Sequence, residues 1–227
     1  MGKHLNNTSL TMAACLCAVA CGGSNSGDVT SAQSTAAGSG TGADGGTAFA
    51  PIEGDVGNYF VSGDWHGYLW TTAQGSGTSI TPTTFAEQTT GMPRCVTGTV
   101  GVSPDYSAVA ILGLNLNEDN NGKMTATPTK QGVLVNVKNN AGSSLQFQVE
   151  GKVGDATVHW CALLNGNGGF IPWSDLNTAC WDKSGKPYNN EPLWWAAIVV
   201  SGNTTVDVPF DFCLNALGES DDPSAGH

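Results

Sequence analysis

The cysteines and tryptophans are the residues of this chain whose chemistry depends most on their surroundings. Residues 160–181 begin with Trp-Cys and end with Cys-Trp, and Trp173 lies between the two pairs. A cysteine can act as a redox group, a metal ligand or half of a disulfide, and the compartment decides among these roles. The N-terminus indicates this compartment.

Residues 1–20 have the features of a secretory signal peptide. Lys3 supplies a short positive region, and residues 12–20 form an uncharged run that is shorter than the ~20 apolar residues a membrane span needs. Residues 18–20, Ala-Val-Ala, form a small-residue cleavage site directly before Cys21. This site resembles the lipobox of bacterial lipoproteins, although alanine stands at position 18 where leucine is usual.

The cysteine count favours lipidation of Cys21. The chain has seven cysteines, and cleavage would remove Cys15 and Cys17, which leaves an odd number. An odd thiol in an oxidising compartment needs a purpose, and a lipid on Cys21 supplies one. Ordinary signal-peptidase cleavage is the alternative. We expect an exported protein of the bacterial cell envelope or surface that meets the membrane only through this anchor.

The remaining sequence divides into three regions. Residues 21–55 consist of the lipidated cysteine and a tether rich in Gly, Ser, Ala and Thr, which cannot bury enough apolar surface to become ordered. Residues 56–218 have the length of one domain, which we expect to be a monomer, and residues 219–227 form an acidic tail expected to be disordered. The net charge of −11 argues against nucleic acid as a partner.

The sequence of the domain predicts an all-β fold. Short runs rich in β-branched and aromatic residues alternate with turn signals, and no segment keeps a helical apolar period. Eight or nine strands without a helix predict a two-sheet antiparallel β-sandwich of jelly-roll type. Residues 132–151 are predicted to form a hairpin whose alternate residues, from Val133 to Val149, face the core. Its polar residues would then share the outer face with His159 of the next strand: Asn136, Lys138, Gln146, Gln148 and Glu150.

The four cysteines of the domain are predicted to form two disulfides. They lack the close C-x₂-C pairs typical of zinc sites and the C-x-x-C redox motif. Three pairings are possible, and we favour Cys161 with Cys180, which end one irregular segment, and Cys95 with Cys213. Among the tryptophans, Trp160 and Trp173 are expected in the core, whereas Trp181 opens a polar turn and is expected to be partly exposed.

Several segments together resemble the bacterial surface domains related to carbohydrate-binding modules, within the broad galactose-binding-like jelly-roll group. They include HGYLWT, CVTGTV, SLQFQVEG and FIPWSDLNTACWDKSGKPYN, and the resemblance covers about residues 56–217. It implies a two-sheet sandwich that is often non-catalytic and often holds a structural calcium. Unlike many proteins of this group, this protein is expected to have no catalytic partner domain.

The predicted function is therefore non-catalytic binding of a polysaccharide or cell-surface glycan, with no cofactor. Aromatic faces stack on sugar rings, and planar amides and carboxylates bind their hydroxyl groups. The candidate ligand-binding residues combine both kinds of side chain: Tyr68, Trp70, Trp181, Asn136, Gln146, Gln148, Glu150 and His159.

Two other functions and a metal site stay open at this point. A structural or adhesive surface protein would need no small ligand, and a small jelly-roll polysaccharide-degrading enzyme would need two opposed carboxylates. Glu150 beside His159 is the only juxtaposition that suggests catalysis, and no G-x-S-x-G motif is present. A structural calcium could be held by Asp64 and Asp211 if the first and last strands paired.

Overall fold

The computed structural model describes residues 59–62, 65–85, 93–118 and 125–224, all within the unit Asp44–His227. The predicted secretory signal, the predicted lipidation site Cys21 and the predicted tether lie outside these residues, as does Asp64. Within the described residues, no helix has both the length and the apolar character needed to span a membrane.

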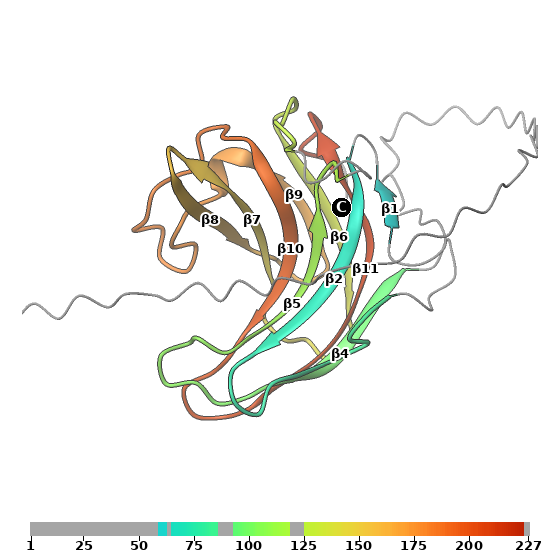
Figure 1. Cartoon of the computed structure of the whole chain (residues 1–227), viewed down its shortest axis with the longest axis vertical. Coiled ribbons are helices and arrows are strands. Elements are labelled where there is room, and N and C mark those ends of the chain that lie inside the picture. The colour runs from blue at the N-terminus through green and yellow to red at the C-terminus, as the bar shows by residue number, and fades with distance from the viewer. Residues whose placement is uncertain (1–58, 63–64, 86–92, 119–124, 225–227) are drawn as a thin grey trace, which may run out of the picture. The chain divides into compact units, whose positions relative to one another are not determined.

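The described residues form two antiparallel sheets (Figure 1). The six-stranded sheet has the order β1-β2-β5-β10-β7-β8, and the five-stranded sheet has the order β3-β4-β11-β6-β9. The first comprises β1 (Tyr59–Ser62), β2 (Trp65–Gln74), β5 (Val109–Asn115), β10 (Leu193–Ser201), β7 (Gln146–Val153) and β8 (Ala156–Leu163). The second comprises β3 (Ser79–Thr81), β4 (Arg94–Val100), β11 (Val208–Ser220), β6 (Gly132–Asn139) and β9 (Gly168–Pro172), which is followed by the 3₁₀ turn η1 (Trp173–Asp175).

The strand pairing is that of a jelly roll, as predicted. Strands β4 and β11, β5 and β10, β6 and β9, and β7 and β8 form four pairs that are nested in sequence, and alternate pairs fall into alternate sheets. The chain therefore behaves like one long antiparallel ribbon wound into a sandwich, while β1, β2 and β3 extend the two sheets.

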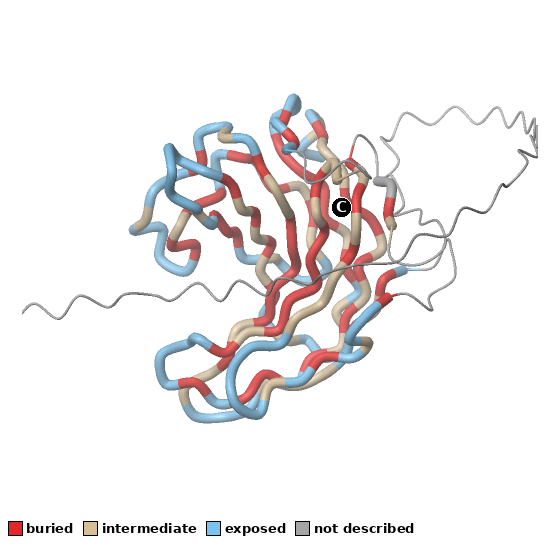
Figure 2. Tube along the Cα trace, in the orientation of Figure 1, coloured by how far each residue is buried: buried red, intermediate tan, exposed pale blue. Residues whose placement is uncertain are grey.

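The core lies between the sheets and follows the period-2 alternation of the strands (Figure 2). Val133, Val135 and Val137 of β6 face it from one sheet, and Phe147 and Val149 of β7 face it from the other. Trp160 and Trp173 are buried in the same core, and Trp181 is 67% exposed, so the three tryptophan predictions are confirmed.

The predicted hairpin at residues 132–151 is wrong. Strand β6 pairs with β11 and β9, whereas β7 pairs with β10 and β8. The connection therefore crosses between the sheets, and β11 contacts its first residues: the backbone N–H of Asn140 donates to the Asp211 carbonyl at 2.9 Å, and Asn140 Nδ2 donates to Asp211 Oδ1 at 3.1 Å. Instead, β7 and β8 form the tight hairpin, with Gly154 at a φ of +61° in its two-residue turn.

Both predicted disulfides are present. Cys95 and Cys213 are direct cross-strand partners on β4 and β11, with Cα atoms 3.9 Å apart. Cys161 on β8 is bonded to Cys180, with Cα atoms 5.3 Å apart. Two disulfides indicate an extracytoplasmic protein, because reducing compartments keep thiols free.

The last strand extends further than expected. β11 runs to Ser220, two residues beyond the predicted end of the domain at Gly218. Glu219 ties this end to the rest of the sandwich, because its carboxylate accepts hydrogen bonds from Trp65 Nε1 at 2.9 Å and from the backbone N–H of Thr129 at 2.7 Å. Glu219 and Ser220 therefore belong to the domain, and not to a disordered tail.

Candidate functional site

Six of the predicted ligand-binding residues lie on the outer face of the six-stranded sheet. Tyr68 and Trp70 alternate with the buried Trp65 and Leu69 on β2, so they point away from the core. Gln146, Gln148 and Glu150 alternate in the same way with Phe147 and Val149 on β7, and His159 lies opposite Glu150 on β8.

The remaining two predicted residues lie elsewhere. Asn136 is on the outer side of the five-stranded sheet, where its Oδ1 accepts a hydrogen bond from Asn215 Nδ2 at 2.9 Å. The expected amide-rich face that joined Asn136 and Lys138 to the β7 residues is therefore wrong, because β6 and β7 belong to different sheets. Trp181 follows Cys180 in the loop between η1 and β10.

Trp70 lies face-on over a glycine of the neighbouring strand. Gly113 on β5 is its cross-strand partner, and a Cβ atom at Gly113 would lie 2.2 Å from both Cε2 and Cζ2 of the indole and 2.6 Å from Cη2. Only a residue without a side chain leaves room for the ring in this position. One face of the indole therefore rests on the backbone of β5, and its other face points outward.

A hydrogen bond and a ring contact fix Trp70 in this position. Its Nε1 donates to Asn115 Oδ1 at 2.9 Å, and Asn115 Nδ2 donates in turn to Glu118 Oε2. The ring of Trp195 on β10 meets Trp70 edge-on, with centroids 5.9 Å apart and planes at 89°. The indole is thus fixed by contacts within the protein, and a side chain fixed in this way would lose little entropy if a ligand bound to it.

A row of side chains continues from Trp195 to the edge of the sheet. Asn115, Trp195, Glu150 and His159 are successive cross-strand partners on β5, β10, β7 and β8. His159 packs against the Trp195 ring with centroids 5.4 Å apart, and its Nε2 lies 2.5 Å from Glu150 Oε2. The His159 side chain is 49% exposed and that of Glu150 is 16% exposed, so the pair is open to solvent mainly through the imidazole.

The other side of Trp70 leads to the opposite edge of the sheet. Tyr59 on the edge strand β1 is the cross-strand partner of Tyr68, and their rings meet edge-on with centroids 5.2 Å apart. Together these rings and their polar neighbours define the outer-face band: Tyr59, Tyr68, Trp70, Asn115, Trp195, Gln148, Glu150 and His159.

The outer face of the same sheet is apolar next to the band. Ile111, Ala197 and Val199 form a second small hydrophobic cluster with Trp70, Val109 and Trp195 packed against it. Gln146 lies beside this cluster and donates from Nε2 to Ser201 Oγ at 3.3 Å. An apolar cluster packed against partly exposed rings distinguishes this face from the purely polar surface of an ordinary solvated sheet.

Four residues of the site were not predicted from the sequence: Tyr59, Gly113, Asn115 and Trp195. The alternation of the segment LWWAAIVV indicated a strand, but it could not show which strand lies beside it. A β-bulge between Leu193 and Trp195 also shifts the register of two adjacent tryptophans, and the sequence alone does not show this shift. Trp194 is also partly exposed, and Lys152 Nζ lies 4.8 Å from the centroid of its ring.

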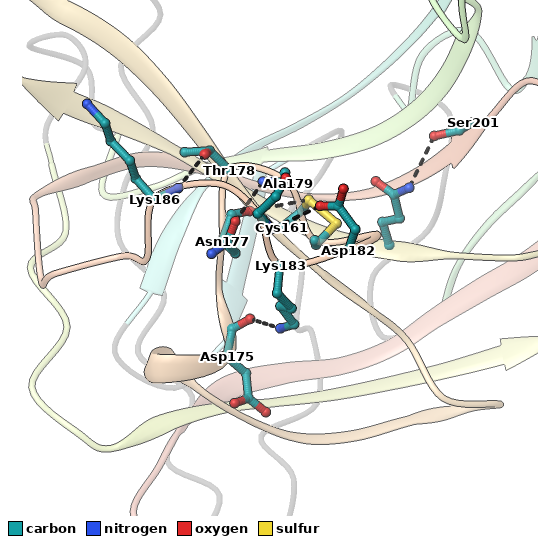
Figure 3. The surroundings of a disulfide bond; sticks show 12 residues. Cys161, Asp175, Asn177, Thr178, Ala179, Asp182, Lys183, Lys186 and Ser201 are labelled. Atoms are coloured by element: carbon teal, nitrogen blue, oxygen red, sulfur yellow. Dashed lines mark hydrogen bonds between the residues drawn. A yellow bond between two sulfur atoms is a disulfide. The ribbon is translucent and has the colours of Figure 1, made fainter.

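The Cys161–Cys180 disulfide holds a loop against β8 (Figure 3). Asn177 pairs with Cys161 through two backbone hydrogen bonds, and its side chain accepts from the Ala179 N–H at 2.9 Å. Lys183 Nζ donates to the Asp175 carbonyl, which closes the loop on η1. A hollow of about 220 Å³ lies between this loop and β9, lined by Leu163, Phe170, Asp175 and Lys183 among others. It shares no residue with the outer-face band.

The calcium site predicted at Asp64 and Asp211 stays a prediction, because Asp64 lies outside the described residues. Of the described strands, the first, β1, pairs with β2, and the last, β11, pairs with β4 and β6, so the expected pairing of first and last strands is not formed. Among the described residues, no three His, Cys, Asp or Glu side chains gather closely enough to hold a metal ion.

A scan against protein-family models finds no match for this chain, and a search of curated proteins finds no relative. Neither comparison supports the resemblance to carbohydrate-binding modules, and the evidence on function comes from the geometry of the outer face.

Proposed function

We propose that this protein is a non-catalytic glycan-binding protein of the bacterial cell envelope, and that the outer-face band is its binding surface. The supporting observation is the position of Trp70, which rests one face on Gly113 and is fixed by Asn115. A rigid indole with its other face outward suits stacking on the C–H side of a sugar ring. The amides and carboxylates around it can bind the hydroxyl groups.

The charges of this surface favour a neutral or weakly basic glycan. Glu118 and Glu150 lie close to the two central tryptophans, Trp70 and Trp195. The described strands of the six-stranded sheet carry a single lysine or arginine, Lys152, which lies near Trp194. The net charge of −11 acts in the same direction. Polysaccharides rich in carboxylate or sulfate groups would be repelled.

The proposal includes attachment through a lipid on Cys21. The two disulfides support export, and the small-residue site before Cys21 supports processing at that residue. The tether of residues 22–50 would then hold the sandwich away from the membrane surface. Mass spectrometry of the membrane fraction would detect the acylated Cys21 peptide, and recovery of that peptide without lipid would contradict this part of the proposal.

Affinity electrophoresis of the mature chain through gels containing neutral, amino-bearing or anionic polysaccharides tests the binding function. We expect retardation by at least one neutral or amino-bearing polymer, loss of it in Trp70→Ala, and its preservation in Trp181→Ala, a matched variant that removes an exposed indole outside the band. If none of the polysaccharides retards the protein, the proposal is wrong.

A reducing-end assay distinguishes binding from hydrolysis. Glu118 and Glu150 are both on this face, and Glu150 contacts His159, so the assay should be run on every polymer that binds. We expect no release of reducing ends. Release that disappears in Glu150→Gln would identify the protein as an enzyme.

A further inference from the structure

We infer that the outer-face band binds an internal stretch of an extended polysaccharide, and that the polysaccharide lies across the strands. This inference rests on the proposed glycan-binding function and specifies the class of ligand. It concerns the shape and length of the bound segment, which the proposed function leaves open.

The direction follows from which strand carries each ring. Tyr59 and Tyr68 are cross-strand partners on β1 and β2, Trp70 covers Gly113 of β5, and Trp195 and His159 lie on β10 and β8. The ring contacts from Trp70 through Trp195 to His159 therefore run across the strands and not along them. Along any one strand, by contrast, the band contributes only one or two rings.

The length follows from the number of strands crossed. The band includes residues of all six strands, and neighbouring strands lie about 4.8 Å apart, so it spans roughly 24 Å. This distance is several times the width of one sugar ring. A single sugar would occupy the centre of the band and leave the rings at its two ends unused.

The ends of the band lie at the edges of the sheet. Strands β1 and β8 are the two edge strands, and they carry Tyr59 and His159. A ligand lying across the sheet can therefore continue past both edges. The described hollow, which could enclose a chain end, lies beside β9 and shares no residue with the band.

Hydrogen-bonding groups accompany the rings along the same direction. Asn115, Gln148 and Glu150 come from β5 and β7, the strands that carry no aromatic side chain in the band. From β2 to β8, rings and amides or carboxylates thus alternate from strand to strand. This alternation suits a polymer whose repeating units each present a flat C–H surface and equatorial hydroxyl groups.

Titration calorimetry with a length series of oligosaccharides, cut from a polysaccharide that the protein retards, tests this inference. We expect affinity to rise with length, by about tenfold for each further ring that the oligosaccharide covers, and to level off once it spans the whole band. A bulky label on the reducing end of a long oligosaccharide should leave its affinity unchanged. A monosaccharide that binds as tightly as the longest oligosaccharide would overturn the inference and leave the proposed function intact.

Variants at the ends and the centre of the band sharpen the test. Tyr59→Ala and His159→Ala should weaken the binding of long oligosaccharides by about tenfold and leave that of short ones unaffected, whereas Trp70→Ala should weaken the binding of both. Tyr106→Ala is the control, because Tyr106 is 61% exposed on a loop outside the band. Equal effects of the end variants on short and long oligosaccharides would contradict binding across the strands. Absence of binding by any glycan would instead overturn the proposed function itself.

Discussion

Two groups of aromatic rings lie on the two sides of the six-stranded sheet. On the inner side, Trp65, Trp173, Tyr188 and Trp160 form a continuous series with successive centroids 6.3, 5.7 and 5.2 Å apart, and all four are buried. On the outer side, Trp70, Trp195 and His159 lie at similar spacings of 5.9 and 5.4 Å, but they are at least partly exposed.

The two series are held by different means. The inner rings are enclosed by both sheets, and the Cys161–Cys180 disulfide joins β8 to the loop that leads to Tyr188. The outer rings have no second layer of described residues over them; Trp70 is instead positioned by a glycine and an amide. Aromatic rings on the inner side thus stabilise the fold, because their burial provides free energy. We infer that the rings on the outer side serve in recognition.

The largest expected difference between the two sides is in stability. Trp160→Ala removes a fully buried ring and should lower the free energy of unfolding by about 3–5 kcal/mol. Trp70→Ala should lower it by at most about 1 kcal/mol, because its ring remains partly exposed to solvent. Urea unfolding of both variants would measure this difference, and equal losses would show that the outer rings are part of the core.

Removal of the disulfide beside the inner rings should have the next largest effect. The double variant Cys161→Ser, Cys180→Ser opens a loop with a sequence separation of 19 and should lose about 3 kcal/mol. Binding at the outer-face band should survive in the folded protein at low temperature, since no residue of the band lies in this loop. Loss of binding with intact folding would show that the loop takes part in recognition.

One of the inner rings, Tyr188, should also make the stability of the protein fall as the pH rises in the alkaline range. Burial raises the pKa of Tyr188, and its OH donates to the Glu191 carbonyl at 2.6 Å. An unfolded tyrosine ionises near pH 10. The stabilising contribution of Tyr188 is therefore complete below about pH 10 and is lost as the pH rises above it. Thermal melts between about pH 8 and 11 should show a smaller decline for Tyr188→Phe than for the natural chain, and identical declines would contradict this assignment.

The fold could be predicted from local signals, whereas the site could only partly be predicted. Period-2 alternation placed Val133, Phe147 and Trp160 on the core side, and the cysteine positions gave both disulfides. The alternation also gave the correct outward direction of Asn136 and Gln148. It could not show that they lie on opposite sides of the sandwich, because assignment to a sheet depends on long-range pairing.

The parts of the site that were missed depend on register. Gly113 supports Trp70, and Trp195 lies between Trp70 and His159, only because β5 and β10 separate β2 from β7 in the sheet. Neither residue carries a local signal for this role. The turn at Asn139–Gly142 looked like a hairpin turn, and only the pairing of β6 with β11 and β9, and of β7 with β10 and β8, shows that the chain crosses between the sheets there.

Replacement of Gly113 tests the central claim most directly. No positive φ restricts this position to glycine, so Gly113→Ala should fold with a loss of at most about 1 kcal/mol, while its methyl group displaces the Trp70 ring from the sheet. Calorimetric titration with the retarding polysaccharide should show an affinity about tenfold weaker than that of the natural chain. Unchanged affinity in a folded Gly113→Ala protein would contradict the claim that a preformed Trp70 platform binds the ligand.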